Sequence, residues 1–597
     1  MRRHLKPARA AALLLAVAVV AAACTSGESP APATSSTTVA SEATEGPTTT
    51  TLEQDTTTTS GDLKPVGGDV VLGQAKEPPT LNPFAPGGQS AIVTFIGNAY
   101  WAGVQTIDGT TLELVPDVVI ELPTTANRGL VVNDDGTMTV RYDIHPDAVW
   151  EDGTPISGDD FEFTYDTIMD PDLPIAKLVY EDIIPSSVRA GAKTFEYTMT
   201  APTVQVEFLF GVILPKHSVE GSDFISDWND TMWVSGGPFV LSEWSPGEQL
   251  TVVRNENYWK KDPETGQQLP LLDGVTFRFI PGAEDLAAAF ARREVDAINP
   301  LSDLEIIGDL EALEPEGAVV DLRGGPLWEH LNFQFGPGRL DRNETSCNEN
   351  LNMRRAVAHA VDKQAIVDLL LDGRVEPLDS YVDLYSPTSS NDAWAQYRFD
   401  PGLAAELYRA AVEEAGVECS VVFTAVTNEQ VRVELAELLA AMFADADIPY
   451  RQELEAIEPF WGVTVPTGTW DSGEWAWIGS PGLAGLIGLH DVWDPEAPPP
   501  LGQNVYEWGT PDSSLIDEAT ARYAEIRDAM NATVDEDELA ALVAEAEALL
   551  ADNVVFIPLY ARLNPSAVWA DEIAGYVHNP SQAQDTWNLE EWYRSDR

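Results

Sequence analysis

Residues 150–161 read WEDGTPISGDDF, and this stretch joins a tight turn to the start of a helix. Gly153 permits the turn, and Pro155 fixes the backbone that follows it. Either Ser157 or Asp159 can cap the helix that begins here. These residues set the direction of the backbone, so the stretch fits a scaffold role better than a direct role in chemistry or ligand binding.

A β-hairpin is expected just before this stretch. Two short apolar runs, at 130–132 and 138–142, flank the tetrapeptide NDDG at 133–136. Asp-Gly between such runs is a strong signal for a hairpin turn. The acidic turn lacks the twelve-residue spacing and the closing glutamate of a calcium loop, so we interpret it as a turn only.

The second half of the chain carries the clearest helix signals. Asp400 as N-cap, Pro401 at the first helical position and Gly416 as stop predict a helix between them. The same reasoning predicts helices over 350–361, 364–371, 429–443 and 535–550, alternating with extended runs at 420–425 and 554–559; a further strand is expected at 69–72. The predicted class is mixed α and β, with sheets flanked by helices.

The N-terminal residues predict export. Basic residues precede an apolar run over 10–23 that is short for a membrane span, and small residues lead into Cys24. This ending resembles the lipobox of bacterial lipoproteins, with Ala21 where leucine is usual, so cleavage without lipid attachment is the alternative. We assign 1–23 to a signal peptide and 24–66 to a Thr/Ser/Pro-rich flexible tether that begins at the lipidated cysteine.

Composition limits the remaining possibilities. The chain has 34 basic and 97 acidic residues, a net charge of −63, which argues against binding to nucleic acid or to anionic lipid. The roughly 530 residues after the tether exceed one hydrophobic core, so two or three lobes are expected. No Gly-Lys dipeptide occurs, which excludes a nucleotide-binding P-loop.

Two cysteines remain beyond the lipid-anchor candidate. In an oxidising compartment Cys347 and Cys419 could pair, and the closed loop would contribute about 4 kcal/mol in the chain-entropy model. Two unpaired buried thiols are the alternative.

Three segments, in this order, carry a family resemblance. The first runs from YDIHP at 142–146 through the stretch quoted above. The second runs from GGPF at 236–239 to RNENYW at 254–259, and the third is MRRAVAHAVDK at 353–363. Shorter pieces, REVD at 293–296 and FIPLY at 556–560, support them. Together they resemble the extracellular solute-binding proteins, family 5, of ATP-driven importers, which include dipeptide, oligopeptide and nickel binders.

The resemblance implies a periplasmic-binding-protein type II-like clamp of two lobes with an additional domain. A ligand would close the lobes by a hinge motion. The expected bounds are lobe I at 67–105 and 233–325, an inserted domain at 106–232, lobe II at 326–550 and a return to lobe I at 551–597. The implied protein is a monomer without cofactor or enzyme activity, lipid-anchored to the outer face of the cell membrane or periplasmic, with an ABC permease and ATPase subunits as partners.

Aromatic residues gather where the resemblance places the ligand cleft. Seventeen tryptophans are many for this length, and indoles with a polar edge suit a wet cleft that holds sugars or peptide side chains. Packing in the core is the alternative for each. The ligand-binding candidates are Tyr100, Trp101, Trp328, Asn332, Gln334, Trp461, Trp475, Trp477, Trp493, Tyr506 and Trp508.

The class of ligand stays open between a peptide and a sugar-like oligomer. The resemblance implies, for oligopeptide binders, an aspartate shortly after a tryptophan such as Trp477, where it pairs with the peptide's α-amino group. Here IGSP follows, and the next acids are Asp491 and Asp494, which would have to reach the cleft to substitute. Glu474 is either a partner for a cation or a solvated surface acid.

Other functions lack sequence support. The histidines of the mature chain have no pair at metal-ligand spacing, so no metal site is predicted. The G-x-S-x-G and H-E-x-x-H motifs are absent, which argues against an exported hydrolase. A surface receptor that lacks its own permease is the remaining alternative, and gene neighbourhood would separate it from an importer component.

Overall fold

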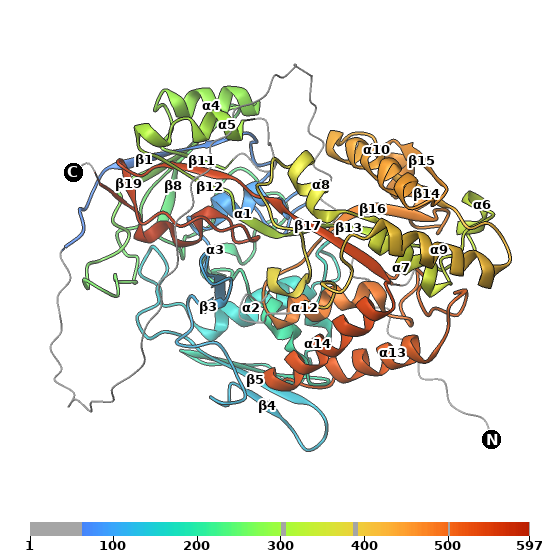
Figure 1. The fold of residues 1–597 in the computed structure, drawn as a ribbon. Coiled ribbons are helices and arrows are strands. Elements are labelled where there is room, and N and C mark those ends of the chain that lie inside the picture. Colours follow the sequence, from blue (N-terminus) through green and yellow to red (C-terminus); the bar gives the residue numbers. More distant parts are fainter. Residues whose placement is uncertain (1–62, 300–305, 386–391, 500–501, 596–597) are drawn as a thin grey trace, which may run out of the picture.

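The computed structural model describes residues 63–299, 306–385, 392–499 and 502–595 as a mixed α/β protein (Figure 1). The predicted signal peptide, Cys24 and all but the last residues of the tether lie outside the described residues. No helix within the described part of the chain is long and apolar enough to cross a membrane.

Lobe I is built on a seven-stranded sheet in the order β12-β18-β11-β1-β10-β9-β8. Strand β1 (Asp69–Gln74) runs parallel to its neighbours β10 (Gly274–Phe279) and β11 (Ala297–Ile298). The other strands are β8 (Phe239–Ser245), β9 (Gln249–Arg254), β12 (Ala318–Asp321) and β18 (Ser566–Trp569). Both faces of β1 are covered, because Val70 and Leu72 enter one hydrophobic cluster and Val71 packs on another.

The inserted domain carries a four-stranded sheet in the order β4-β5-β7-β6. The predicted hairpin is confirmed, since β4 (Leu130–Val132) pairs antiparallel with β5 (Met138–Asp143). Helix α2 (Gly158–Met169) begins after Ser157, whose backbone N–H donates to the Asp160 carboxylate at 2.9 Å. Ser157, not Asp159, is therefore the cap. The sheet is completed by β6 (Arg189–Ala190) and β7 (Thr194–Met199), while β2 (Gln105–Ile107) and β3 (Leu114–Pro116) form a separate two-stranded sheet.

Lobe II contains a five-stranded sheet in the order β15-β14-β16-β13-β17. Its strands are β13 (Gly324–Phe333), β14 (Val421–Val426), β15 (Tyr450–Glu455), β16 (Ser472–Ile478) and β17 (Phe556–Leu563). The predicted helices are confirmed as α7 (Leu351–Ala360), α8 (Lys363–Leu370), α9 (Pro401–Ala415), α10 (Gln430–Asp445) and α14 (Glu536–Asp552). Asp400 caps α9 by accepting from the backbone N–H of Leu403 at 2.9 Å.

The chain crosses between the lobes twice. The outward crossing lies between β12 and β13, and the return lies between β17 and β18. The return therefore falls at residues 564–565, later than the expected 551, because β17 completes the lobe II sheet before the chain leaves it.

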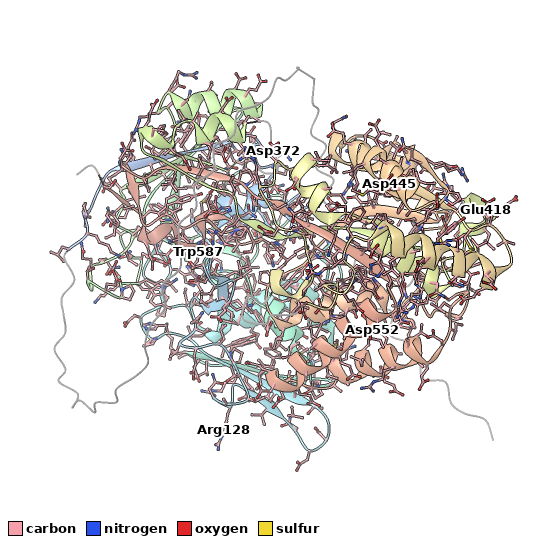
Figure 2. The ribbon with its side chains drawn as sticks, in the orientation of Figure 1. Arg128, Asp372, Glu418, Asp445, Asp552 and Trp587 are labelled. Carbon is pink, nitrogen blue, oxygen red and sulfur yellow. A yellow bond between two sulfur atoms is a disulfide. The ribbon has the colours of Figure 1, made fainter. Side chains whose placement is uncertain are left out.

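Lobe II contains a disulfide and carries acidic side chains on its surface. Cys347 and Cys419 form a disulfide that spans 72 residues of sequence, so of the two alternatives for these cysteines the structure contains the paired one. Acidic side chains project from the exterior, as Figure 2 shows for Asp372, Glu418 and Asp445.

Candidate functional site

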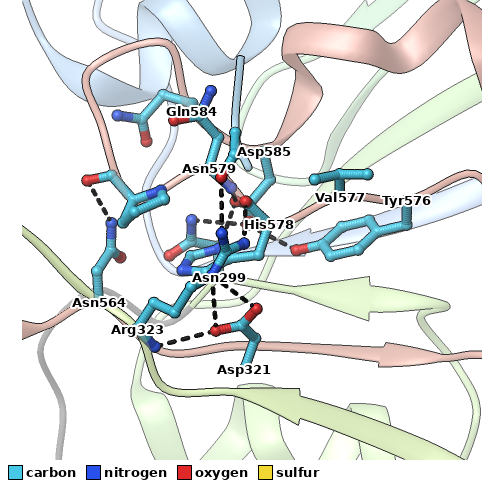
Figure 3. Close-up of polar contacts among 12 residues, drawn as sticks. Asn299, Asp321, Arg323, Asn564, Tyr576, Val577, His578, Asn579, Gln584 and Asp585 are labelled. Carbon is cyan, nitrogen blue, oxygen red and sulfur yellow. Dashed lines mark hydrogen bonds and ion pairs between the residues drawn. The ribbon is translucent and has the colours of Figure 1, made fainter. Parts of the chain in front are cut away.

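The two crossings form a hinge with a polar centre, drawn in Figure 3. The backbone N–H of Asn564, on the return crossing, donates to the carbonyl of Arg323, on the outward crossing, at 3.1 Å. The Arg323 guanidinium is fixed by Asp321 at 3.0 Å and by the carbonyl oxygens of Gly109 and His578. Arg323 thus links the two crossings to the inserted domain and to the C-terminal segment.

Asp585 organises the C-terminal side of this hinge. Its buried carboxylate accepts hydrogen bonds from the backbone of Asn579 at 2.8 Å, from Tyr576 at 2.7 Å and from Asn299 at 2.9 Å. The Nδ1 atom of His578 lies 2.7 Å from the same carboxylate. The Asp585 carboxylate thus ties Asn299 to the C-terminal segment beside the hinge.

Away from the hinge, the inserted domain and lobe II meet at a second place. The short helix η3 (Val204–Phe208) packs against α12 (Leu483–His490) of lobe II. Glu207 accepts a hydrogen bond from the backbone N–H of Ala484 at 3.2 Å. Nearby, Gln582 of the C-terminal segment donates to Ser480 at 2.6 Å. These contacts outline the line along which the lobes touch.

The aromatic candidates of lobe II share one face of its sheet. Trp328 lies opposite Trp477, and His330 lies opposite Trp475, in the antiparallel pairing of β13 and β16. Residues directly opposite each other point to the same side. Over this face lie further aromatic rings, among them Tyr381, which stacks on Trp328 with ring centroids 5.2 Å apart. The predicted residues on or over this face are Trp328, Asn332, Gln334, Trp475, Trp477, Trp493, Tyr506 and Trp508.

Most of these side chains are buried in the interior of lobe II. Within this group only Trp477 keeps part of its surface exposed. Its indole N–H donates to the Tyr506 hydroxyl at 2.5 Å, and His330 lies 3.1 Å from the same hydroxyl. Trp461, partly exposed in its own short helix, has its ring centroid 6.0 Å from that of Trp475. Trp477 and Trp461 are therefore the aromatic candidates of lobe II that keep part of their surface exposed.

Tyr100 and Trp101 lie apart from this group. They belong to a separate hydrophobic cluster with Trp233, and the buried Tyr100 hydroxyl donates to the carbonyl of Leu81. The structure does not bring these two residues together with the lobe II aromatics.

A cluster of charges occupies the opposite face of the lobe II sheet. Glu329 and Glu474 have fully buried side chains, and Arg432 of α10 reaches both, at 3.1 Å and 3.0 Å. Arg562 of β17 pairs with Glu329 and, at 2.7 Å, with Glu429. The reading of Glu474 as a surface acid is wrong, because its cation partner is an internal arginine.

The two buried glutamates differ in their affinity for protons. Burial raises the pKa of Glu474 well above its usual range, and the nearby charge of Glu329 adds to this effect. For Glu329, burial acts in the same direction but is outweighed by Arg432 and Arg562, which lower its pKa below the usual range. We therefore assign the charge of the pair to Glu329 and a proton to Glu474.

Both acids that follow Trp477 have partners within lobe II. Asp491 forms an ion pair with Arg527 of α13 (Glu518–Met530). Asp494 accepts from the backbone N–H of Glu496 at 2.9 Å, and burial raises its pKa. Asp491 is therefore held inside lobe II by its own arginine.

The histidines of this region are neutral. Burial lowers the pKa of both His330 and His490 to about 3. Among the residues that the structure describes, no group of three or more His, Cys, Asp or Glu side chains is arranged to hold a metal ion.

Sequence reasoning missed the groups that meet along the contact line. Glu207, Ser480 and Gln582 belong to no motif and come from three distant segments. Ser480 lies just beyond Trp477 and could have been considered on that ground. Nothing in the local sequence marks Glu207 or Gln582.

Comparison with known proteins identifies a family model and several relatives that are similar to this chain. The family model described as bacterial extracellular solute-binding proteins, family 5, middle, matches residues 122–484, more than half of the chain. A "Probable ABC transporter-binding protein" of Deinococcus radiodurans is 25% identical over 45% of this chain and 49% of its own length. "Protein XP55" of Streptomyces lividans is 27% identical over 54% of this chain and 53% of its own, and "Dipeptide-binding protein DppE" of Bacillus subtilis is 25% identical over 44% and 47%.

These curated relatives match the chain over about half of their length. Solved structures match it over nearly all of theirs. The periplasmic EDTA-binding protein EppA has a TM-score of 0.70 at 18% identity and covers 90% of this chain and 99% of its own. The oligopeptide-binding protein AppA of Bacillus subtilis, in complex with a nonapeptide, has a TM-score of 0.59 at 18% identity, with 89% and 100% covered. The chain shares their two-lobed fold and belongs to the bacterial extracellular solute-binding proteins of family 5.

Proposed function

We propose that this protein is the extracellular substrate-binding component of an ATP-driven importer, which captures a small solute by lobe closure and delivers it to a permease. The observation that carries the proposal is the pair of hinge crossings beside Arg323, combined with a second contact line between η3 and α12. Two bodies joined by two strands and touching elsewhere can open and close about the joint. The family supports this function.

The ligand class we favour is a peptide, with a sugar-like oligomer as the alternative. Trp477 and Trp461 offer partly exposed indole surface on lobe II, which suits either class. The relative named as a dipeptide binder and the AppA complex with a nonapeptide favour the peptide.

Native mass spectrometry of the full-length protein purified from its own cells tests the function. Release of bound material under denaturing conditions should yield a heterogeneous set of peptide masses. A single non-peptide mass would name another solute class and overturn the peptide. An empty protein that also fails to respond to a solute panel in thermal-shift assays would contradict solute capture and favour the receptor alternative.

Trp477→Ala is expected to weaken binding of the recovered ligand about tenfold or more. A tryptophan that covers a ligand contributes more than about 1 kcal/mol to binding when truncated. Isothermal titration calorimetry at constant pH measures the change, and circular dichroism verifies that the variant is folded.

The matched control is Trp244→Ala, which removes a partly exposed indole from β8 of lobe I. It should leave the affinity unchanged. Equal affinities for Trp477→Ala and wild type would remove Trp477 from the site.

We further propose that the protein is anchored to the outer face of the cell membrane through a lipid on Cys24. The Cys24→Ser variant should appear in the culture medium, whereas the wild type should partition with the membrane fraction and into Triton X-114. Membrane association of the serine variant would show that another attachment holds the protein.

A further inference from the structure

Glu207 joins two bodies of the protein outside the two hinge crossings. It lies on η3 of the inserted domain, and its Oε2 accepts from the backbone N–H of Ala484 in the first turn of α12 of lobe II, at 3.2 Å. Gly482, just before α12, has φ +95, and a Cβ at this position would lie 3.3 Å from the same oxygen. The carboxylate is thus fitted closely against the start of the helix.

Apolar side chains from both bodies surround this contact. Val204 and Val206 of η3 are buried, as are Leu486 and Ile487 of α12, and all four belong to one continuous hydrophobic cluster. Separation of lobe II from the inserted domain would expose this surface and return the Glu207 carboxylate to water. Glu207 is half-buried while the two bodies touch and would be more exposed to water if they separated.

Few charges compensate for this desolvation. None of the ion pairs among the described residues includes Glu207, and the charged group that acts on it is Glu536 at the start of α14, an acid. The amide of Gln105 donates to the backbone carbonyl of Glu207, not to its side chain. Burial raises the pKa of Glu207 to about 7; the Ala484 N–H opposes this shift, and Glu536 adds to it.

We propose that Glu207 is a proton-controlled latch between the inserted domain and lobe II, closed when its carboxyl group is protonated and loosened when it ionises. The proposal rests on the lobe closure that the proposed function assumes. It adds a second input, because external acidity would act on closure together with the solute.

The direction of the pH effect follows from the linkage between proton binding and closure. In the open arrangement Glu207 faces water and takes its usual pKa near 4.5, whereas in the closed arrangement its pKa is about 7. Protons therefore bind more tightly to the closed form. Closure is favoured in acid, and this preference is lost as the pH rises from the open-state value through the closed-state value.

Hydrogen exchange on the full-length protein without added solute tests the latch. We expect the amides of α12, corrected for intrinsic exchange rates, to open more readily at pH 8 than at pH 5, with a change of roughly 10-fold to 100-fold in the opening equilibrium. Small-angle scattering should show a larger radius of gyration at pH 8. In Glu207→Gln, which keeps an oxygen acceptor but cannot ionise, both readouts should stay at the closed value.

Two further variants make the result specific. Glu181→Gln, the same substitution at an exposed position of the inserted domain, should behave as the wild type. Glu536→Gln keeps Glu207 and should move the midpoint of the pH response to lower pH, which also tests the proposal if Glu207→Gln fails to fold. An equal pH response in wild type and Glu207→Gln, or none in the wild type, would overturn the latch.

This test is independent of solute capture. Because no solute is added, a flat pH response rejects the latch and leaves the mass-spectrometric result for bound solute unaffected. Conversely, a protein that carries no solute could still show the pH response.

Discussion

Replacing Glu329 by glutamine is expected to lower the free energy of unfolding of lobe II by about 3–5 kcal/mol, the cost of breaking a buried ion pair from one side. The Glu329 carboxylate is fully buried and pairs with Arg432 at 3.1 Å and with Arg562. Its loss would leave two guanidinium groups to share Glu429 and Glu474, so the cluster would hold one carboxyl group fewer. Urea unfolding at pH 7, followed by tryptophan fluorescence, measures the change.

Glu474→Gln is the matched control, since it changes the neighbouring carboxyl on the same face of the sheet. Burial favours the protonated form of Glu474, so the amide is close to an isostere and should cost less than about 1 kcal/mol. Equal losses for the two variants would mean that both carboxyl groups are ionised, and our assignment of charge in the cluster would be wrong.

Removal of the Cys347–Cys419 disulfide should also lower stability strongly. The bond spans 72 residues, and in the chain-entropy model a loop of this length contributes about 4 kcal/mol by restricting the unfolded chain. The double variant Cys347→Ser/Cys419→Ser should therefore unfold at markedly lower urea concentration than the oxidised protein.

Cys24→Ser is introduced into both proteins of this comparison, so that the lipid anchor does not contribute. The single variant Cys347→Ser serves as a further control, because it leaves one thiol unpaired and should match the double variant. Equal unfolding midpoints for the oxidised protein and the double variant would show that the bond adds no stability.

Capping and stop residues made most helices predictable from the local sequence. Asp400 and Gly416 define the two ends of α9 because capping depends on residues next to each other in sequence. The Asp-Gly hairpin between β4 and β5 followed for the same reason. The residue at which the chain returns to lobe I could not be predicted in this way. It depends on the pairing of β17 with β13, which lies more than 200 residues earlier in the chain.

The sequence predicted which residues of the candidate site lie together, but it did not predict how deeply they are buried. Eight of the eleven candidates gather on one face of the lobe II sheet, but period-two alternation cannot distinguish a face that lines a cleft from one that is covered by the same lobe. Glu474 illustrates the same limit, because its arginine partner lies on α10, which the local pattern around β16 does not reveal. Glu207 was missed because its role depends on contact between two bodies.

The strand order of lobe I has a consequence for how the chain folds after export. Strand β11 pairs with β1 and with β18, and β12 pairs only with β18, which comes within the last 32 residues of the chain. The sheet of lobe II, by contrast, is made entirely from residues 324–563. During synthesis β12 therefore has no partner strand until β18 follows it more than 240 residues later, and its unpaired edges invite aggregation and proteolysis. Pairing of β18 with β11 and β12 is therefore the step that completes the lobe I sheet.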